Sequence, residues 1–126
     1  MGQLRAGGLS CLIQADMRRL PLRAGSVDAI WCQAALLHLP RSVVPEVLKD
    51  FGRVVRRGGA LSLSVAEGDG EGFEVAANYG SDRRRWFTFH RAPELTSLLA
   101  AAGFVVLQAS RHRSHRDWLS LDATRE

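Results

Sequence analysis

The run VDAIWC at residues 27–32 is short and apolar and is typical of a buried β-strand. A second such run, ALSLSV, follows at residues 60–65. Between them, residues 42–57 carry apolar side chains at helical spacing, and Gly58-Gly59 predicts the end of that helix. Apolar strands separated by amphipathic helices indicate an α/β domain, in which helices cover a mostly parallel sheet.

The rest of the chain extends the same pattern. An apolar run before residue 27 predicts a first strand, and a helix is expected between Pro93 and Gly103. Residues 67–80 are rich in glycine and acidic side chains, which favours a loop. No helix separates the last two strands, so we expect them to form an antiparallel pair at one edge. The three further strands are predicted at residues 9–15, 104–107 and 118–123.

Composition excludes several classes of protein. The 126 residues include 17 Lys and Arg against 13 Asp and Glu; this basic balance permits a nucleic-acid partner, but a solvated basic surface is the preferred interpretation. Cys11 and Cys32 lie in apolar runs, which predicts buried thiols in a reducing cytoplasm and no disulfide scaffold. No apolar stretch is long enough to span a membrane. His112 and His115 lack further ligands, so no metal site is predicted.

Several segments, in order, carry a family resemblance. ADMRRLPL at residues 15–22 and SVDAIW at residues 26–31 are followed by LLHLP at residues 36–40 and FGRVVRRGGAL at residues 51–61. These passages resemble class I S-adenosylmethionine-dependent methyltransferases of the type 11 kind. The match continues in order to the C-terminus, through residues 67–72, 86–90, 98–104 and 118–119. The resemblance implies a Rossmann-like methyltransferase fold and methyl transfer from S-adenosylmethionine to a small-molecule acceptor.

The resemblance also implies which residues hold the cofactor. Asp16, at the end of a strand, would accept a hydrogen bond from the adenine amino group, and Met17 would offer its N–H and an apolar wall to the ring. The alternative for Asp16 alone is an aspartate that only forms a turn. Gln33 and Ala34 follow the next strand, where the family chain passes the amino acid moiety and the methyl group of the cofactor.

The acceptor side is expected beyond these positions. His38 would contact the acceptor or act as its general base; the alternative is a packing or capping histidine. Glu67, Trp86, Phe87 and His90 lie where the family often builds its acceptor pocket. The alternative is that the aromatic side chains only cover the edge of the sheet.

The glycine-rich loop that defines the family is not present in this sequence. Gly7-Gly8 precedes a strand, whereas the family loop follows one. The resemblance therefore implies that residues 1–126 form a partial, truncated domain without the first two strands and the first helix. Either the flanking strands close up, or the first strand is loosely held, or another chain supplies the missing part.

The absence of the glycine-rich loop has expected consequences for cofactor binding and for function. Cofactor binding by this chain alone is expected to be weak or absent. The alternative function is a non-catalytic, methyltransferase-like interaction module, or a gene fragment that needs a partner chain. An exposed edge of the sheet would then support self-association or binding of that partner.

Overall fold

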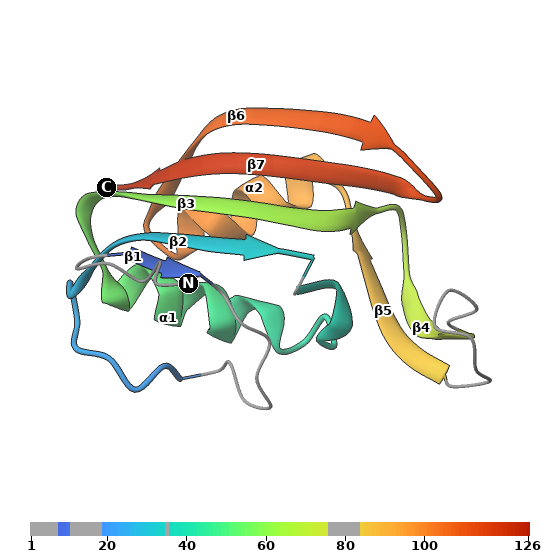
Figure 1. The fold of residues 1–126 in the computed structure, drawn as a ribbon, viewed down its shortest axis with the longest axis horizontal. Coiled ribbons are helices and arrows are strands. Elements are labelled where there is room, and N and C mark those ends of the chain that lie inside the picture. The colour runs from blue at the N-terminus through green and yellow to red at the C-terminus, as the bar shows by residue number, and fades with distance from the viewer. Residues whose placement is uncertain (1–7, 11–18, 35, 76–83) are drawn as a thin grey trace.

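The computed structural model describes residues 8–10, 19–34, 36–75 and 84–126, and Figure 1 shows their arrangement. Three predicted elements appear close to their expected positions: the strand at residue 27, the helix that follows it and the strand after that helix. In chain order the elements are β1 (Gly8–Ser10), β2 (Val27–Gln33), the 3-10 turn η1 (Leu36–His38), α1 (Val44–Val54), β3 (Val55–Glu67), β4 (Glu71–Val75), β5 (Arg84–His90), α2 (Ala92–Ala101), β6 (Phe104–Arg113) and β7 (Asp117–Arg125).

The sheet is mixed, whereas the sequence analysis expected a mostly parallel one. Strands β1, β2 and β3 are parallel, and β3 also pairs in parallel with the end of β5. Strand β7 runs antiparallel between β3 and β6, and β4 runs antiparallel to β5. The expected antiparallel pair, β6 with β7, is present. The sheet is more mixed than expected because β7 also pairs with β3 and because β4 is an additional strand.

A strand replaces part of the loop expected at residues 67–80. Residues Glu71–Val75 form β4, which pairs with β5 so that Phe73 lies opposite Trp86. Their ring centroids are 5.1 Å apart at an interplanar angle of 88°. Cross-strand aromatic pairs stabilise antiparallel strands, so this contact offsets the poor strand propensity of the neighbouring glycines.

The two glycines after α1 serve a bulge, and the prediction that they end the helix was wrong. The helix ends at Val54, and Val55 is already extended. The β2–β3 register shifts here, because Val27 pairs with Val55 but Ala29 pairs with Ala60. A Cβ on Gly59 would lie 2.7 Å from the carbonyl oxygen of Asp28, so the two backbones approach too closely for a side chain.

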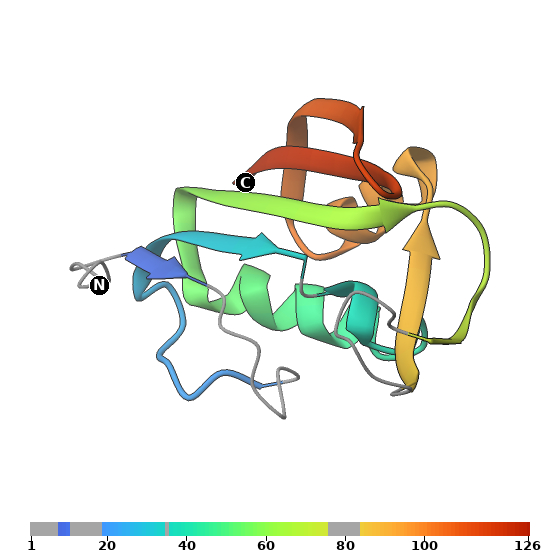
Figure 2. The ribbon, with the colours of Figure 1, turned by 45° about the vertical axis from the view of Figure 1, so that its right-hand side comes forward.

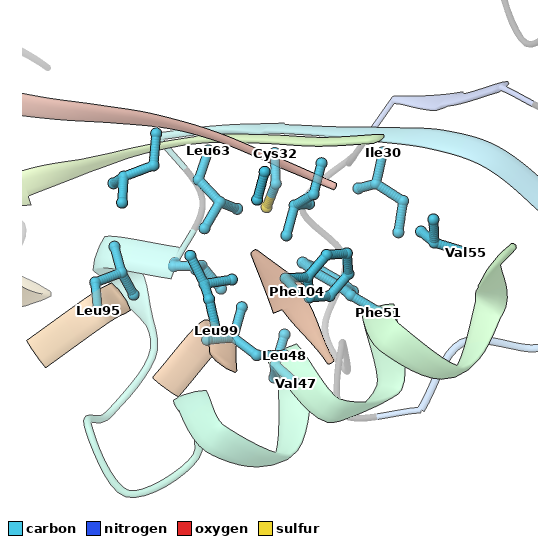
Figure 3. Packing of buried hydrophobic residues seen from close by; sticks show 14 of the residues in the cluster. Ile30, Cys32, Val47, Leu48, Phe51, Val55, Leu63, Leu95, Leu99 and Phe104 are labelled. Carbon is cyan, nitrogen blue, oxygen red and sulfur yellow. The ribbon is translucent and has the colours of Figure 1, made fainter. Parts of the chain in front are cut away.

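Both helices pack on one face of the sheet, and the main core lies between them (Figure 3). Strand alternation and helical spacing direct these side chains to the same layer. Cys32 is buried there, as predicted. The helices contribute Val44, Val47, Leu48, Phe51, Val54, Leu95 and Leu99, and β2 and β3 contribute Ile30, Cys32, Leu61 and Leu63.

Strand β1 pairs directly with β2, with Gly8 opposite Ala29 (Figure 2). In the described residues, β1 is therefore the direct neighbour of β2; residues 11–15 of the predicted first strand lie outside the described residues. On β2, Trp31 alternates with the core residues Ile30 and Cys32 and is 53% exposed. Within the described ranges, no helix has the length and apolar character that a membrane span requires.

Candidate functional site at the carboxyl edge of the parallel strands

The predicted site residues of β2, β3 and β5 lie at one edge of the sheet. Gln33 is the last residue of β2 and pairs with Ser64, while Glu67 and His90 end β3 and β5 and pair with each other. In open α/β sheets, ligands bind outside the carboxyl ends of the strands. The topology therefore brings these residues to the edge where a ligand site is expected.

Ala34 turns the chain sharply at the end of β2. Its φ of 55° lies in the left-handed region, which non-glycine residues seldom adopt. Its N–H is held by the carbonyl oxygen of Ser64 at 3.1 Å and by the Ser64 hydroxyl at 2.9 Å. Gln33 is exposed, and its side-chain amide donates to the Ser62 hydroxyl at 3.3 Å. Ala34 is thus a strained residue held by two hydrogen bonds to β3, which marks this turn as a candidate ligand position.

His38 lies in η1 and meets two other predicted site residues. Its Nδ1 is 3.0 Å from the carbonyl oxygen of Trp86, and its ring packs edge-on against Phe87 with centroids 5.0 Å apart. A carbonyl oxygen only accepts hydrogen bonds, so Nδ1 must carry the hydrogen. In the neutral ring the lone pair is then on Nε2, which is the protonation state that a general base requires.

A buried threonine holds β5 against the turn that carries His38. The indole N–H of Trp86 donates to the Thr88 hydroxyl at 2.9 Å, and that hydroxyl donates to the carbonyl oxygen of Leu39 at 2.5 Å. Thr88 is fully buried. The sequence analysis missed it, although the alternation Trp-Phe-Thr-Phe-His was a strand signal that places Thr88 on the same face as Trp86.

His90 lies in the interior and is 0% exposed. In the described part of the chain neither ring nitrogen has a hydrogen-bond partner, and Nδ1 is 3.6 Å from the Glu94 carboxylate. Burial lowers the pKa of His90 below its usual value, and the nearby Glu94 carboxylate opposes part of that effect. His90 is therefore a neutral interior residue, whereas Trp86 and Phe87 contact His38.

The remaining predicted residue, Glu67, forms an ion pair at the edge. Its Oε2 accepts from Nε of Arg111 at 2.5 Å, and Arg111 is itself largely exposed. The carboxylate is therefore neutralised by β6 across the end of the sheet.

Comparisons with known proteins agree with this fold. A family model described as a methyltransferase domain matches residues 3–63. A Methanosarcina mazei S-adenosylmethionine-dependent methyltransferase superposes with a TM-score of 0.73 at 16% identity, covering 87% of this chain and 64% of that one. This chain has the class I methyltransferase fold. Its first half also matches the methyltransferase family in sequence.

Two further methyltransferase structures were solved with cofactor or product bound. One is the Burkholderia thailandensis 1,6-didemethyltoxoflavin-N1-methyltransferase with bound 1,6-didemethyltoxoflavin and S-adenosylhomocysteine. It has a TM-score of 0.65 at 22% identity, and the match covers 88% of this chain and 48% of that one. The Synechocystis magnesium protoporphyrin IX methyltransferase, with S-adenosylmethionine, has a TM-score of 0.61 at 18% identity, and 88% of this chain covers 43% of it. This chain thus spans about half the length of several methyltransferases that it matches. No curated protein matches it.

Within this methyltransferase fold, the structure describes two of the four predicted cofactor contacts. Asp16 and Met17, the predicted adenine contacts, lie outside the described residues. Gln33 and Ala34 are at the strand end where the resemblance places the methionine end of the cofactor. In the described ranges, no group of three or more His, Cys, Asp or Glu side chains is arranged to hold a metal ion.

Arg41 joins α2, β4, β5 and the turn before β4 through one polar network. Its guanidinium donates to the Glu94 carboxylate, to the carbonyl oxygen of Phe89 and to that of Gly70, and its N–H donates to Glu71 at 2.8 Å. Burial raises the pKa of Glu94, but the hydrogen bonds from Arg41 and from the Arg91 N–H, together with the charge of Arg41, outweigh burial and hold that pKa below its usual value. No sequence motif indicated this network.

Aromatic side chains of β5 and β7 make further contacts near this edge. The guanidinium carbon of Arg116 lies 4.4 Å from the ring centroid of Phe87 and 5.9 Å from that of Phe89. Trp118, at the start of β7, stacks on His112 with centroids 6.4 Å apart. The sequence analysis named Phe87 as a site residue, placed Trp118 only in a strand and in the family match, and did not name Arg116; the pairing of β7 with β3 brings Trp118 opposite Ala66.

A cavity of about 470 Å³ lies elsewhere, on the outer side of α1. None of the predicted site residues lines it. Its lining residues are Arg19, Glu46, Lys49, Asp50 and Arg53. Asp50 and Arg53 there form an ion pair that also binds the backbone of Leu20, so this cavity belongs to the anchoring of the loop before β2.

Proposed function

We propose that this chain is the later part of a methyltransferase domain and transfers the methyl group of S-adenosylmethionine to a small-molecule acceptor. The observation that supports this most is the state of His38, whose Nδ1–H is directed to the Trp86 carbonyl oxygen at the ligand-binding edge. On this proposal residues 1–126 correspond to the family domain without its first two strands and first helix.

The cofactor would supply an activated methyl group on a sulfonium. Nε2 of His38 would accept the proton that the acceptor's hydroxyl or amine loses, and Trp86 would keep the ring in the required tautomer. Phe87, packed on the His38 ring, would limit the directions from which an acceptor approaches. Most of the rate enhancement would come from positioning the two reactants, because the displacement needs an in-line approach.

Cofactor binding is proposed to involve Asp16 and Met17 at the adenine and Gln33 with Ala34 at the methionine end. The exposed Gln33 amide and the turn at Ala34 lie at the end of β2 and fit a small polar ligand there. The sequence has no glycine-rich loop to approach the ribose and carboxylate closely. We therefore expect weak binding, which a partner chain would strengthen.

Calorimetric titration with S-adenosylhomocysteine tests the cofactor part of the proposal. We expect weak but measurable binding that Asp16→Asn reduces, because a neutral amide is a poorer acceptor for the adenine amino group. Asp28→Asn is the matched control, since Asp28 is exposed, pairs with Arg56 and lies at the opposite end of β2 from Gln33. Absence of heat at high protein concentration would refute binding by the chain alone.

A second proposed function is an interaction module that completes its fold with another chain. It is favoured by Trp31, which is 53% exposed on the face of β2 opposite the helices. The partner would be a second copy or a chain that supplies the earlier strands. Light scattering distinguishes the two functions: a dimer that Trp31→Ser converts to monomer supports the module, whereas a stable monomer at all concentrations contradicts self-association.

A further inference from the structure

We propose that two copies of this chain associate through the face of the sheet opposite the helices, with Trp31 of each copy packed over Asp122 of the other. That face is called the outer face below. This inference rests on the second proposed function, the interaction module, and it identifies the surface, the partner and the contact. The two copies are related by a two-fold axis that runs parallel to the strands, above Ser62 on β3.

The first argument is a row of three residues that crosses the outer face. Trp31 on β2 pairs with Ser62 on β3, and Ser62 pairs with Asp122 on β7. Because side chains alternate along a strand, all three point away from the helices (Figure 3). Neighbouring strands are about 4.8 Å apart, so Trp31 and Asp122 flank Ser62 and are roughly 10 Å from each other. The chain neighbours of the three belong to the main core on the helix side: Ile30, Cys32, Leu61, Leu63, Leu121 and Ala123.

The second argument is that this row fits a second copy of itself. A two-fold axis parallel to the strands and above Ser62 exchanges the two ends of the row, so Trp31 of each copy comes over Asp122 of the other. The same rotation brings Gln33 over Ser120, because these two residues flank Ser64 of β3 in register. Sheets often pack face to face with their strands nearly aligned. The outer face is therefore self-complementary, as a two-fold interface requires.

The third argument is the size of the side chains on this face. Trp31 is a large apolar side chain and is mostly exposed. The paired positions of β3 and β7 beside it carry short side chains, which leave room for the indole ring of the other copy: Ala60, Ser62, Ser64, Ser120 and Thr124. Burial of this ring between two sheets would remove exposed apolar area from water in both copies.

The fourth argument is the chemistry at the two ends of the row. Trp31 and Asp122 are both exposed, and among the described residues neither the indole N–H nor the carboxylate has a hydrogen-bond or ion-pair partner. An indole N–H only donates and an ionised carboxylate only accepts. The two-fold axis gives each dimer two such pairs, and hydrogen bonds to an ionised group are stronger than neutral ones.

The extent of the face determines how the inference is tested. The outer face of β2, β3, β7 and β6 covers roughly 300–400 Å² per copy over the length of residues 60–64, from the spacing and rise of strands. A stable complex typically buries about 800 Å² per partner, so this dimer is expected to be weak. Association of the whole chain is therefore measured by sedimentation equilibrium in a series that extends to high protein concentration.

We expect a monomer–dimer equilibrium in the unmodified chain. Trp31→Phe keeps an aromatic ring but removes the N–H, and Asp122→Ala removes the acceptor. Each should weaken dimerisation at least about tenfold, because each removes both symmetry-related hydrogen bonds. The double variant should be about as weak as the single ones, because side chains that act through each other give non-additive losses. Asp122→Asn should lose less than Asp122→Ala, since its amide oxygen still accepts.

Asp69→Ala is the matched control. Asp69 is also an exposed carboxylate, but it lies beyond the end of β3 and pairs with Arg91. It should dimerise like the unmodified chain, and equal weakening in Asp69→Ala and Asp122→Ala would overturn the inference, because net charge would then explain the loss. Thermal unfolding followed by circular dichroism should be the same in all variants at low concentration.

Three other outcomes separate this inference from the functions it builds on. A dimer unaffected by Trp31→Phe and Asp122→Ala would overturn the inference and leave self-association standing. Losses that simply add in the double variant would overturn the contact between the two side chains. A monomer at every concentration would overturn the inference and self-association together, while binding of S-adenosylhomocysteine would still test the methyltransferase function separately.

Discussion

A single carbonyl oxygen sets the chemistry available to His38. Because Trp86 O accepts from Nδ1, we expect the neutral imidazole to be the Nδ1–H tautomer, whereas free histidine in water populates both tautomers. Long-range nitrogen–proton NMR at pH 8 measures this directly. His112 is the control, because it is exposed and stacks on Trp118. An Nε2–H tautomer at His38 would contradict the assignment and remove the general-base role.

The buried His90 makes stability depend on pH. Its pKa is lower in the folded chain than in the unfolded chain, so the unfolded state binds more protons below about pH 6.5. The free energy of unfolding should therefore fall as pH falls from about 6.5, and this loss ends once the folded-state pKa is passed. Around His90, Glu94 and Glu71 favour its protonation and Arg41 opposes it.

Urea unfolding at pH 7.5 and pH 5.5 measures this effect. His90→Leu removes the titrating ring and should reduce the difference in unfolding free energy between the two pH values. His112→Leu, at an exposed position, should leave the difference as it is in the unmodified chain. Three carboxyl groups have lowered pKa values in the folded chain: Asp50, Asp69 and Glu94. Their contribution to the unfolding free energy is lost only at lower pH, as the pH falls through their folded-state pKa values. An unchanged difference in His90→Leu would refute the assignment.

At the scale of elements, Thr88 connects β5 to η1. Thr88→Val keeps the shape but leaves the Trp86 N–H and the Leu39 carbonyl oxygen without their partner. We expect a loss of about 1–3 kcal/mol in the free energy of unfolding and a shifted His38 resonance. Thr96→Val, on the exposed side of α2, is the matched control and should change neither. A destabilised Thr88→Val chain with an unchanged His38 signal would show that the hairpin does not position His38.

The bulge between β2 and β3 gives a second test on elements. Gly59→Ala forces a methyl group against the carbonyl oxygen of Asp28, so we expect a loss of about 1–3 kcal/mol in unfolding free energy, measured in urea. Gly72→Ala on β4 meets nothing within 4 Å and is the control. Similar losses in both variants would mean that glycine content, and not the close approach, sets the stability.

These elements also show what the sequence could predict. The apolar runs of β2 and β3 and the helical spacing of α1 were sufficient to predict these three elements, because the period of the apolar residues fixes which face of an element is buried. Strand β4 was missed because its strand character comes from the pairing of Phe73 with Trp86 across the hairpin. The same limit applies to the contacts at the candidate site. The ordered motifs named His38, Trp86 and Phe87, which the structure brings into contact. They did not name Thr88, Arg41 or Arg116, whose contacts join elements distant in sequence.

At the scale of the whole molecule, stability rests on one layer of core between the sheet and two helices (Figure 3). Phe51 is fully buried on α1, and Phe104 and Ile30 belong to the same cluster. Truncation of a buried phenylalanine costs about 3–5 kcal/mol. Domains of this size are stable by only about 5–15 kcal/mol, so Phe51→Ala should leave the fold marginal.

The expected result for Phe51→Ala is a large drop in the midpoint of thermal unfolding, followed by circular dichroism. Leu107→Ala is the control: this side chain is 68% exposed, so its loss should change stability by less than about 0.5 kcal/mol. A small effect at Phe51 would indicate a loosely packed core. The arrangement of β2, β3 and β5 at their carboxyl edge would then need a partner chain to stabilise it. A large effect would show that this one core layer stabilises the edge without a partner.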